Sequence, residues 1–231
     1  MRRRGEIDTR DGVSPLDHPR ALTRSSYLRA LQSLSKSDRR LARILNDLGA
    51  PPTWFRPPGF STLVYVVLEQ QVSLASAKAA YDRLNQTVSP LVPASFLSLD
   101  ARTLKKVGFS RQKTDYCRRL ARAAMSGALD LEGLARMGDD EAKAVLMGQK
   151  GIGQWSADIY LVHALRRPDA WPATDLALAT AAFEELSLKT RPTADDLEAI
   201  GEWWRPWRSV AARLLWHAYL SKRNGSGPRA M

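Results

Sequence analysis

Hydrophobic residues recur at steps of three and four along most of this chain, as in SSYLRALQSLSKSDRRLARILNDLG, residues 25–49. Side chains at this spacing fall on one face of an α-helix. An exposed strand would instead alternate hydrophobic and polar residues, and no segment of any length does so. The pattern therefore predicts an all-α fold with short connections between its helices.

Glycine and proline mark where these helices should end. PPTWFRPPG, residues 51–59, is expected to be a rigid linker, and Gly108 a tight turn between two helices. Pro206 should split the last helical segment into two. We expect helical structure in 25–49, 60–88 (one long helix or two abutting helices), 100–127 on both sides of the turn, 139–148, 154–167, 176–186 and 193–222.

The 231-residue chain is 44% hydrophobic, which is enough for a core in one large domain or two small ones. Its formal net charge is +11. Such an excess of Lys and Arg favours a polyanionic partner, with nucleic acid the first candidate and an anionic membrane surface the second. A basic surface without such a partner is the alternative that charge alone leaves open.

Cysteine and histidine are too few and too scattered for a zinc or iron–sulfur site. Cys117 is the single cysteine and is expected to be a small core residue. Residues 1–20 and 224–231 are expected to be flexible, the first a basic tail. Neither a secretion signal nor a membrane span is expected, and we predict a cytoplasmic protein, nucleoid-associated if bacterial.

QKGIGQWSA, residues 149–157, places two glycines between two helical segments. Gly151 and Gly153 are expected to adopt left-handed backbone angles and to expose their N–H groups. The following helix would point its first amides at the same place, and Lys150 would add a positive charge, as in a phosphate-binding site. A tight turn without a ligand is an equally open interpretation of this motif alone.

LMGQKGIGQWSADIYLVHAL resembles the helix–hairpin–helix of the DNA glycosylases. WPATDLAL follows at the distance where that superfamily carries its catalytic aspartate. From residue 55 to 220, the chain is similar in collinear order to the 3-methyladenine DNA glycosylase branch. It departs at Gln149, where an aliphatic residue is usual, and at Thr174, where an acid is common.

The resemblance implies a two-lobed all-α fold with the active site in the cleft between the lobes. Residues 21–58 and 176–223 would form one lobe, and residues 59–175 the other, with the helix–hairpin–helix at 139–165. It also implies double-stranded DNA with a damaged base as partner, and a monomer is expected. The activity would be hydrolytic removal of alkylated bases such as 3-methyladenine and 7-methylguanine.

Asp175 is the candidate catalytic residue under this resemblance. A carboxylate beneath the sugar stabilises the cation that forms when the glycosidic bond breaks, and can activate water. From the residues alone, Asp175 is also a natural N-cap for the following helix. Trp155 stands where strand-cleaving relatives carry the lysine that forms a Schiff base, so a monofunctional enzyme is expected.

Aromatic residues near these motifs are candidates for a pocket that holds a cationic alkylated base. Trp203, Trp207 and Trp216 are expected to be core residues instead. Gln71 is the candidate wedge that fills the gap left by the extruded base, with Gln70 second, unless both only contact a neighbouring helix. The proposed base pocket consists of Trp155, Trp204, Tyr65, Tyr160 and Trp171.

The DNA backbone would be held by Lys150, Gly151 and Gly153, with Arg111 and Lys113 as weaker candidates. Relatives bind a monovalent cation through hairpin carbonyls, which here would be those of Met147, Gln149 and Ile152; no other cofactor is expected. Two further interpretations stay open. One is a DNA-binding protein without catalysis, and the other is a glycosylase for oxidised or mismatched bases.

Overall fold

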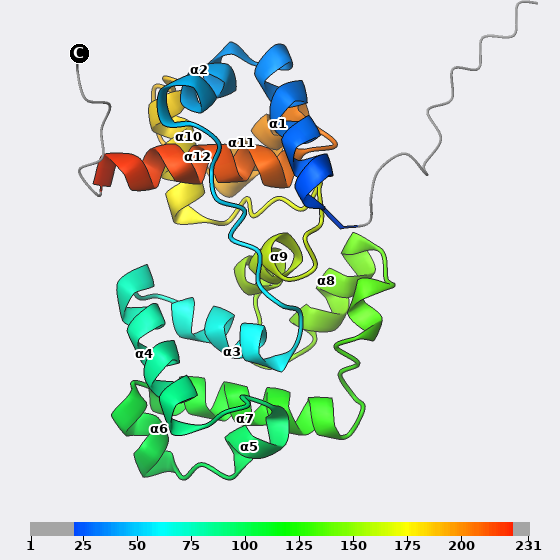
Figure 1. Cartoon of the computed structure of the whole chain (residues 1–231), viewed down its shortest axis with the longest axis vertical. Coiled ribbons are helices and arrows are strands. Elements are labelled where there is room, and N and C mark those ends of the chain that lie inside the picture. Colours follow the sequence, from blue (N-terminus) through cyan, green and yellow to red (C-terminus); the bar gives the residue numbers. More distant parts are fainter. Residues whose placement is uncertain (1–20, 224–231) are drawn as a thin grey trace, which may run out of the picture.

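The computed structural model describes residues 21–223, and the two predicted tails lie outside this range. The described chain consists of twelve α-helices and two short 3-10 helices, and contains no strand. This confirms the all-α prediction. Figure 1 shows the helices in two groups, one above the other, with α9 between them.

The upper group, here called the terminal lobe, combines the two ends of the described chain (Figure 1). Its helices are α1 (Arg24–Ser37), α2 (Arg39–Leu48), α10 (Leu176–Glu185), α11 (Ala194–Gly201) and α12 (Arg208–Arg223), with a 3-10 helix at Glu202–Trp204. The lower group, the central lobe, contains α3 (Phe60–Glu69), α4 (Leu74–Thr87), α5 (Pro93–Leu97), α6 (Ala101–Val107), α7 (Arg111–Met125), α8 (Asp139–Met147) and α9 (Gln154–His163), with a 3-10 helix at Gly133–Ala135.

Segment 25–49 forms two helices rather than one because Asp38 interrupts it. Asp38 has an extended backbone, and its carboxylate accepts a hydrogen bond from the Arg40 amide at 2.9 Å, which starts α2. Burial alone would raise the pKa of Asp38, but hydrogen bonds from Arg40 and Trp204 lower it to about 2. An N-cap buried between two helices therefore also connects α2 to the Trp204 side chain.

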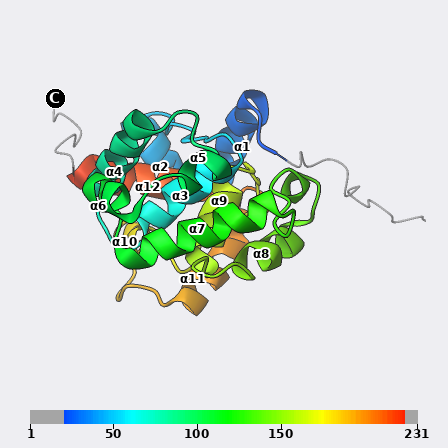
Figure 2. The same cartoon turned by 90° about the horizontal axis from the view of Figure 1, so that it is seen from below.

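Segment 60–88 forms two helices, α3 and α4, separated by residues 70–73. Gln71 takes a positive φ of 57° in this break, and the Ser73 side chain caps α4. Gly108 turns the chain between α6 and α7 with a φ of 113°, as predicted. In the central lobe α3 packs against α4, α7 and α9, and Figure 2 shows α7 running across this layer.

Arg213 on α12 joins the two lobes from inside. It is fully buried, and its guanidinium donates to the carbonyls of Thr53 at 2.8 Å, Val162 at 2.8 Å and Ser209 at 2.7 Å. These carbonyls belong to the linker, to α9 and to α12 itself. Because an unpartnered buried cation is costly, this network ties the linker and α9 to the terminal lobe.

Two details of the fold depart from the sequence expectations or were not anticipated. The short helix α5 was not predicted. Trp203 is 56% exposed rather than part of the core, with the Arg40 guanidinium 5.0 Å from its ring centroid. Cys117 is fully buried, as expected. Within residues 21–223, no helix is long and apolar enough to cross a membrane.

Candidate functional site

Asp175 lies at the N-terminus of α10, and its carboxylate accepts three hydrogen bonds. The Leu178 amide donates to Oδ1 at 2.7 Å, Trp216 Nε1 to the same oxygen at 3.1 Å, and Trp155 Nε1 to Oδ2 at 2.7 Å. Asp175 is 9% exposed. It is therefore the N-cap of α10 and, at the same time, a carboxylate held between two indole rings.

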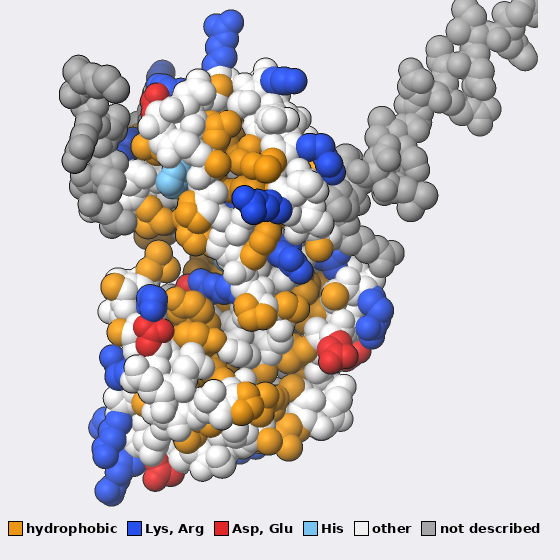
Figure 3. Space-filling model, viewed as in Figure 1, with side chains coloured by type: hydrophobic (Ala, Val, Ile, Leu, Met, Phe, Trp, Pro, Cys, Tyr) orange, Lys and Arg blue, Asp and Glu red, His pale blue; other side chains and the backbone are white. Residues whose placement is uncertain are grey.

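A cavity of about 480 Å³ opens beside this carboxylate, within the size range of small-molecule sites. Both lobes contribute to its wall. Figure 3 shows the molecule hollowed between the two lobes, with hydrophobic side chains on both edges of the hollow. The lining residues are Trp54, Arg56, Glu69, Val72, Ser73, Leu74, Trp155, Ile159, His163, Asp175, Ala177, Trp216, Tyr219 and Leu220.

One side of the cavity carries a paired cation and anion. The Arg56 guanidinium donates to both carboxylate oxygens of Glu69, at 2.8 and 2.6 Å. It also lies 4.2 Å from the ring centroid of Tyr65, which itself stacks on Tyr81. Since the bidentate pair compensates both charges, this side adds little net charge to the cavity.

His163, the last residue of α9, forms another part of the cavity wall. Its Nδ1 lies 3.0 Å from the Trp54 carbonyl oxygen, and its ring stacks on Trp216 with a centroid distance of 5.6 Å. Burial, followed by the charges of Arg213 and Arg56, lowers the pKa of His163 well below its usual value. The imidazole is therefore neutral at physiological pH.

A wider groove of about 1000 Å³ adjoins the cavity, and Asp175 and Trp155 border both. The hairpin between α8 and α9 forms one edge of the groove, and the break between α3 and α4 forms another. Exposed hydrophobic side chains, Val72 at 46% and Leu176 at 64%, lie along it. A long partner in the groove would therefore pass directly over the Asp175 carboxylate.

The two hairpin glycines differ in conformation. Gly151 has a φ of 96°, and an added Cβ would lie 2.2 Å from the Tyr116 ring. Gly153 has an ordinary φ of −93°, which corrects the prediction of a left-handed angle, and a Cβ there would meet no atom within 4 Å. Gly153 precedes α9 without any side-chain cap and lines the groove together with Trp155 and Ser156, and Lys150 is exposed.

The two candidate wedge residues, Gln70 and Gln71, differ in their contacts and in their exposure. Gln70 donates from Nε2 to the Gly151 carbonyl at 2.9 Å and to Ser156 Oγ at 2.8 Å. This side chain holds the hairpin against α3, and the wedge assignment for Gln70 is dropped. Gln71 is exposed in the groove with its φ of 57°. Of the two glutamines, Gln71 is the one that stays a candidate wedge residue.

Lys113 does not reach outward as expected of a DNA-backbone contact. Its ammonium donates to the carbonyls of Leu68 at 2.8 Å and Gln70 at 2.9 Å, at the C-terminal end of α3. Burial lowers the pKa of Lys113. This lysine is a cap for α3, because unpaired carbonyls at a helix end attract cations. Arg111, in contrast, is exposed at the first position of α7.

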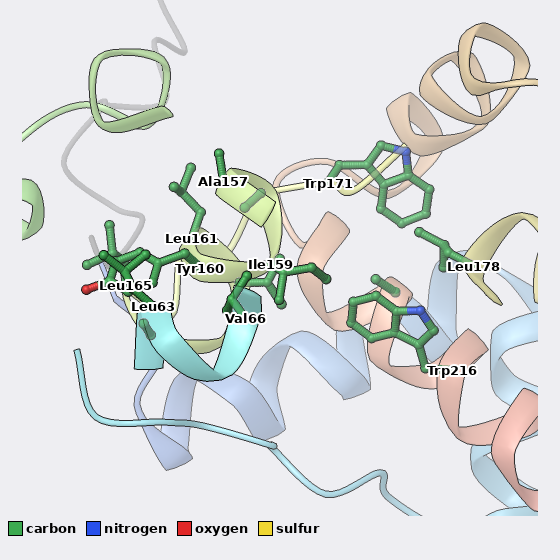
Figure 4. Packing of buried hydrophobic residues seen from close by; sticks show 14 of the residues in the cluster. Leu63, Val66, Ala157, Ile159, Tyr160, Leu161, Leu165, Trp171, Leu178 and Trp216 are labelled. Atoms are coloured by element: carbon green, nitrogen blue, oxygen red, sulfur yellow. The ribbon is translucent and has the colours of Figure 1, made fainter. Parts of the chain in front are cut away.

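Three predicted pocket aromatics belong to the core instead. Trp204 is 1% exposed and donates to Asp38, Trp171 donates to the Leu197 carbonyl, and the Tyr160 hydroxyl accepts from the Gly59 amide. Figure 4 shows Tyr160 packed beside Leu63, Leu161 and Leu165, and Trp171 apart from Trp216. Their polar atoms have partners inside the fold, and none of the three side chains lines the cavity or the groove.

The sequence reasoning missed several residues of the cavity wall. Trp216 was assigned to the core, and Trp54, Arg56, Glu69 and His163 were not singled out. Tyr65 lies behind Arg56 and is not part of the wall. The one available signal was Glu69, an acid within the hydrophobic run LVYVVLE, which required a buried partner.

The carbonyl positions predicted for a monovalent cation lie in the hairpin. The Gln149 carbonyl accepts a hydrogen bond from the Ile152 amide at 3.0 Å, as in a tight turn. A carbonyl oxygen has a second lone pair, so this contact is compatible with a cation ligand. Between residues 21 and 223, no group of three or more His, Cys, Asp or Glu side chains is arranged to hold a metal.

Comparison with known proteins gives relatives over most of the chain. It is 25% identical over 209 residues to the alkylbase DNA glycosidase-like protein mag2 of Schizosaccharomyces pombe, covering 87% of this chain and 98% of that protein. It is 27% identical over 191 residues to DNA-3-methyladenine glycosylase 1 of the same yeast, covering 80% and 83%.

Solved structures share the fold. The structure of S. pombe 3-methyladenine DNA glycosylase (Mag1) in complex with abasic DNA matches with a TM-score of 0.78 and 27% identity, over 84% of this chain and 97% of that chain. The family model described as HhH-GPD superfamily base excision DNA repair protein matches residues 64–206, which is more than half of the sequence. The chain therefore belongs to the HhH-GPD superfamily of base excision DNA repair proteins.

Proposed function

We propose that this protein is a monofunctional DNA glycosylase that hydrolyses the N-glycosidic bond of alkylated purines in double-stranded DNA. The observation that carries the proposal is the Asp175 carboxylate, held by two indole N–H groups where the cavity meets the groove. The names of the S. pombe relatives support the substrate class.

Asp175 would act on the sugar of the damaged nucleotide. As the bond from C1′ to the base nitrogen breaks, its electron pair leaves with the base and positive charge develops on the sugar. A carboxylate has roughly four lone-pair positions, and three hydrogen bonds leave room for one more contact. Asp175 stabilises the cation and accepts a proton from the water whose oxygen adds to C1′.

The cavity would hold the extruded base, since the target atom is inaccessible inside a stacked duplex. Trp155 and Trp216 line it with electron-rich rings, which attract a base made cationic by alkylation. A cationic purine leaves without prior protonation, so a general acid is not required. Gln71, exposed beside the cavity, would occupy the gap in the duplex.

The hairpin would hold the phosphate backbone. The first amides of α9 and the exposed Lys150 offer hydrogen bonds and positive charge to one phosphate. Arg111 lies exposed at the start of α7 and would contact another. When bound, a sodium or potassium ion would add positive charge at the carbonyls of Met147, Gln149 and Ile152.

Strand cleavage is not expected. A lyase needs an amine that attacks the sugar. Among residues 21–223, Lys113 is the only lysine that lines the cavity or the groove, and two carbonyls already hold its ammonium. The product should be an intact strand with an abasic site.

The test is a single-turnover assay on duplexes that carry one 3-methyladenine or 7-methylguanine. The expected result is base release without strand scission, and no protein–DNA adduct after borohydride reduction. Binding of the duplex without base release would support the DNA-binding protein instead. A trapped adduct lost in Lys150→Ala would place the amine in the hairpin and overturn the monofunctional mechanism.

A further inference from the structure

The position of the proton on His163 follows from its contacts. The Trp54 carbonyl can only accept a hydrogen bond, so Nδ1 of His163, 3.0 Å away, must donate. A neutral imidazole carries one proton only. The other ring nitrogen, Nε2, therefore carries a lone pair and is a hydrogen-bond acceptor.

Most other polar groups of the cavity wall already have partners. The Trp155 and Trp216 N–H groups donate to Asp175, and Arg56 donates to both oxygens of Glu69. His163 differs from these groups because its hydrogen bond to the Trp54 carbonyl uses Nδ1, while its ring forms part of the cavity wall. Stacking on Trp216 and the bond to Trp54 leave the imidazole little freedom to rotate.

We propose that His163 is a specificity-determining residue, whose Nε2 accepts a hydrogen bond from an N–H group on the edge of the extruded base. The inference rests on the proposed glycosylase function. Trp216 contacts Asp175 with its indole nitrogen and His163 with its face, so the base edge and the sugar are recognised from adjoining parts of one wall.

The substrate class that fits is a purine with an N–H donor at this edge, such as the exocyclic amino group of 3-methyladenine. A base whose amino nitrogen is closed into a ring, such as 1,N6-ethenoadenine, offers no hydrogen there. It would leave the buried acceptor unpaired. A site built to bond an N–H discriminates against analogues that lack it, by roughly tenfold or more.

Two substitutions separate this role from a structural one. His163→Asn places an amide N–H near the position of Nδ1, which keeps a donor for the Trp54 carbonyl, but has no atom at the position of Nε2. His163→Gln is the reverse, because its longer amide reaches the position of Nε2 and cannot also bond Trp54. Ile159→Val is the control, since Ile159 lines the same cavity without a polar atom.

The first measurement is the single-turnover excision rate on matched duplexes with 3-methyladenine or 1,N6-ethenoadenine. His163→Asn should lower the rate on 3-methyladenine about tenfold and leave the slower rate on the etheno base unchanged. His163→Gln and Ile159→Val should keep most of the preference. An equal loss on both bases in His163→Asn, or a preference lost only in His163→Gln, would overturn the proposal.

The second measurement does not need catalysis, so that failure of the glycosylase function and failure of this inference can be told apart. Quenching of the cavity tryptophans reports binding of free adenine and of purine, which lacks the amino group. The unsubstituted chain should bind adenine about tenfold more tightly, and His163→Asn should bind both alike. Equal binding of both bases by the unsubstituted chain would refute the proposed role of His163, whether or not the protein releases bases.

Discussion

Two helices, α9 and α10, begin at the same groove and have ten residues each, yet their N-termini are built differently. Gly153 precedes α9 and provides no side-chain cap. Asp175 precedes α10, and its carboxylate accepts the Leu178 amide and two indole N–H groups. The N-terminus of α9 therefore has no negatively charged cap, whereas the N-terminus of α10 is capped by the Asp175 carboxylate.

The difference shows how one physical property can serve two purposes. A helix N-terminus attracts negative charge because its first amides are unpaired. At α9 this attraction is available to a phosphate from outside. At α10 it helps to hold an internal carboxylate, which can then face a developing cation. Substitutions that exchange or weaken these two arrangements should therefore differ in the size of their effects.

Removing the charge at α10 should have the largest effect. Asp175→Asn keeps the size of the side chain but removes the charge that stabilises the sugar cation. Single-turnover excision should fall by about two to three orders of magnitude. Affinity for a lesion-bearing duplex should remain, which a titration of the same variant checks. Excision close to the unsubstituted rate would remove Asp175 from the mechanism.

An aspartate placed directly before α9 should make this N-terminus resemble that of α10 and abolish the phosphate contact proposed for it. Gly153→Asp should weaken binding of damaged and undamaged duplexes alike, about tenfold, because phosphate contacts carry no sequence information. The dependence of affinity on salt should decrease by about one unit of slope.

Gly153→Ala is the matched control for this substitution. Its φ of −93° suits any residue and its Cβ meets no atom within 4 Å, so fold and affinity should be kept. If both variants bind duplex as well as the unsubstituted chain, in a titration at fixed salt, the hairpin is only a turn between helices.

Weakening the support of the α10 carboxylate should have a smaller effect. Trp155→Phe and Trp216→Phe each remove one N–H donor to Asp175 and keep an aromatic ring. A lost hydrogen bond to a charged group costs about 1.5–3 kcal/mol at most, so excision should slow by about tenfold. Trp155→Phe should be the more severe, since its bond measures 2.7 Å against 3.1 Å. A thermal melt controls for loss of fold.

A second aspartate, on α9, should affect stability rather than catalysis. Asp158 is buried and pairs with Lys143 at 2.7 Å, and its Oδ2 has no hydrogen-bond partner. Burial raises the pKa of Asp158 to about 6, although Lys143 opposes this shift. The folded state therefore binds a proton more readily than the unfolded chain, and this contribution to stability declines as the pH rises from about 4 to 6.

Asp158→Asn should remove this pH dependence. The free energy of unfolding of the unsubstituted chain should fall by about 1 kcal/mol more between pH 5 and pH 7 than that of the variant. Urea unfolding at the two pH values measures the difference. Parallel changes in both proteins would show that Asp158 keeps an ordinary pKa. Excision at pH 7 should be little changed.

The tryptophans show what the sequence could not predict about the site, namely which of their rings line the cavity. Trp171, Trp204 and Trp216 are equally aromatic and lie in comparable helical or loop segments. Trp216 lines the cavity and donates to Asp175, whereas Trp204 is 1% exposed and donates to Asp38, a residue 166 positions away. The assignment of Trp204 to the pocket was therefore wrong, whereas Trp216 is buried as expected and, in addition, lines the cavity.

Local signals were sufficient where a few neighbouring residues decide the structure. The spacing of hydrophobic residues predicts the helices, Gly108 predicts a tight turn, Gly151 a left-handed backbone angle, and Asp175 an N-cap. Each of these depends on interactions over about one helical turn. For the same reason the sequence by itself determined the all-α class and, with its resemblance, the candidate acid.

Only the tertiary structure decided what surrounds that acid. The bond from Trp216 to Asp175 joins residues 41 positions apart, and Lys113 reaches carbonyls more than 40 positions away. Contacts of this range depend on how the helices pack against one another, which hydrophobic spacing along one helix does not specify. The same packing assigned Gln70 to the hairpin and Gln71 to the groove, and it placed His163 in the wall of the cavity.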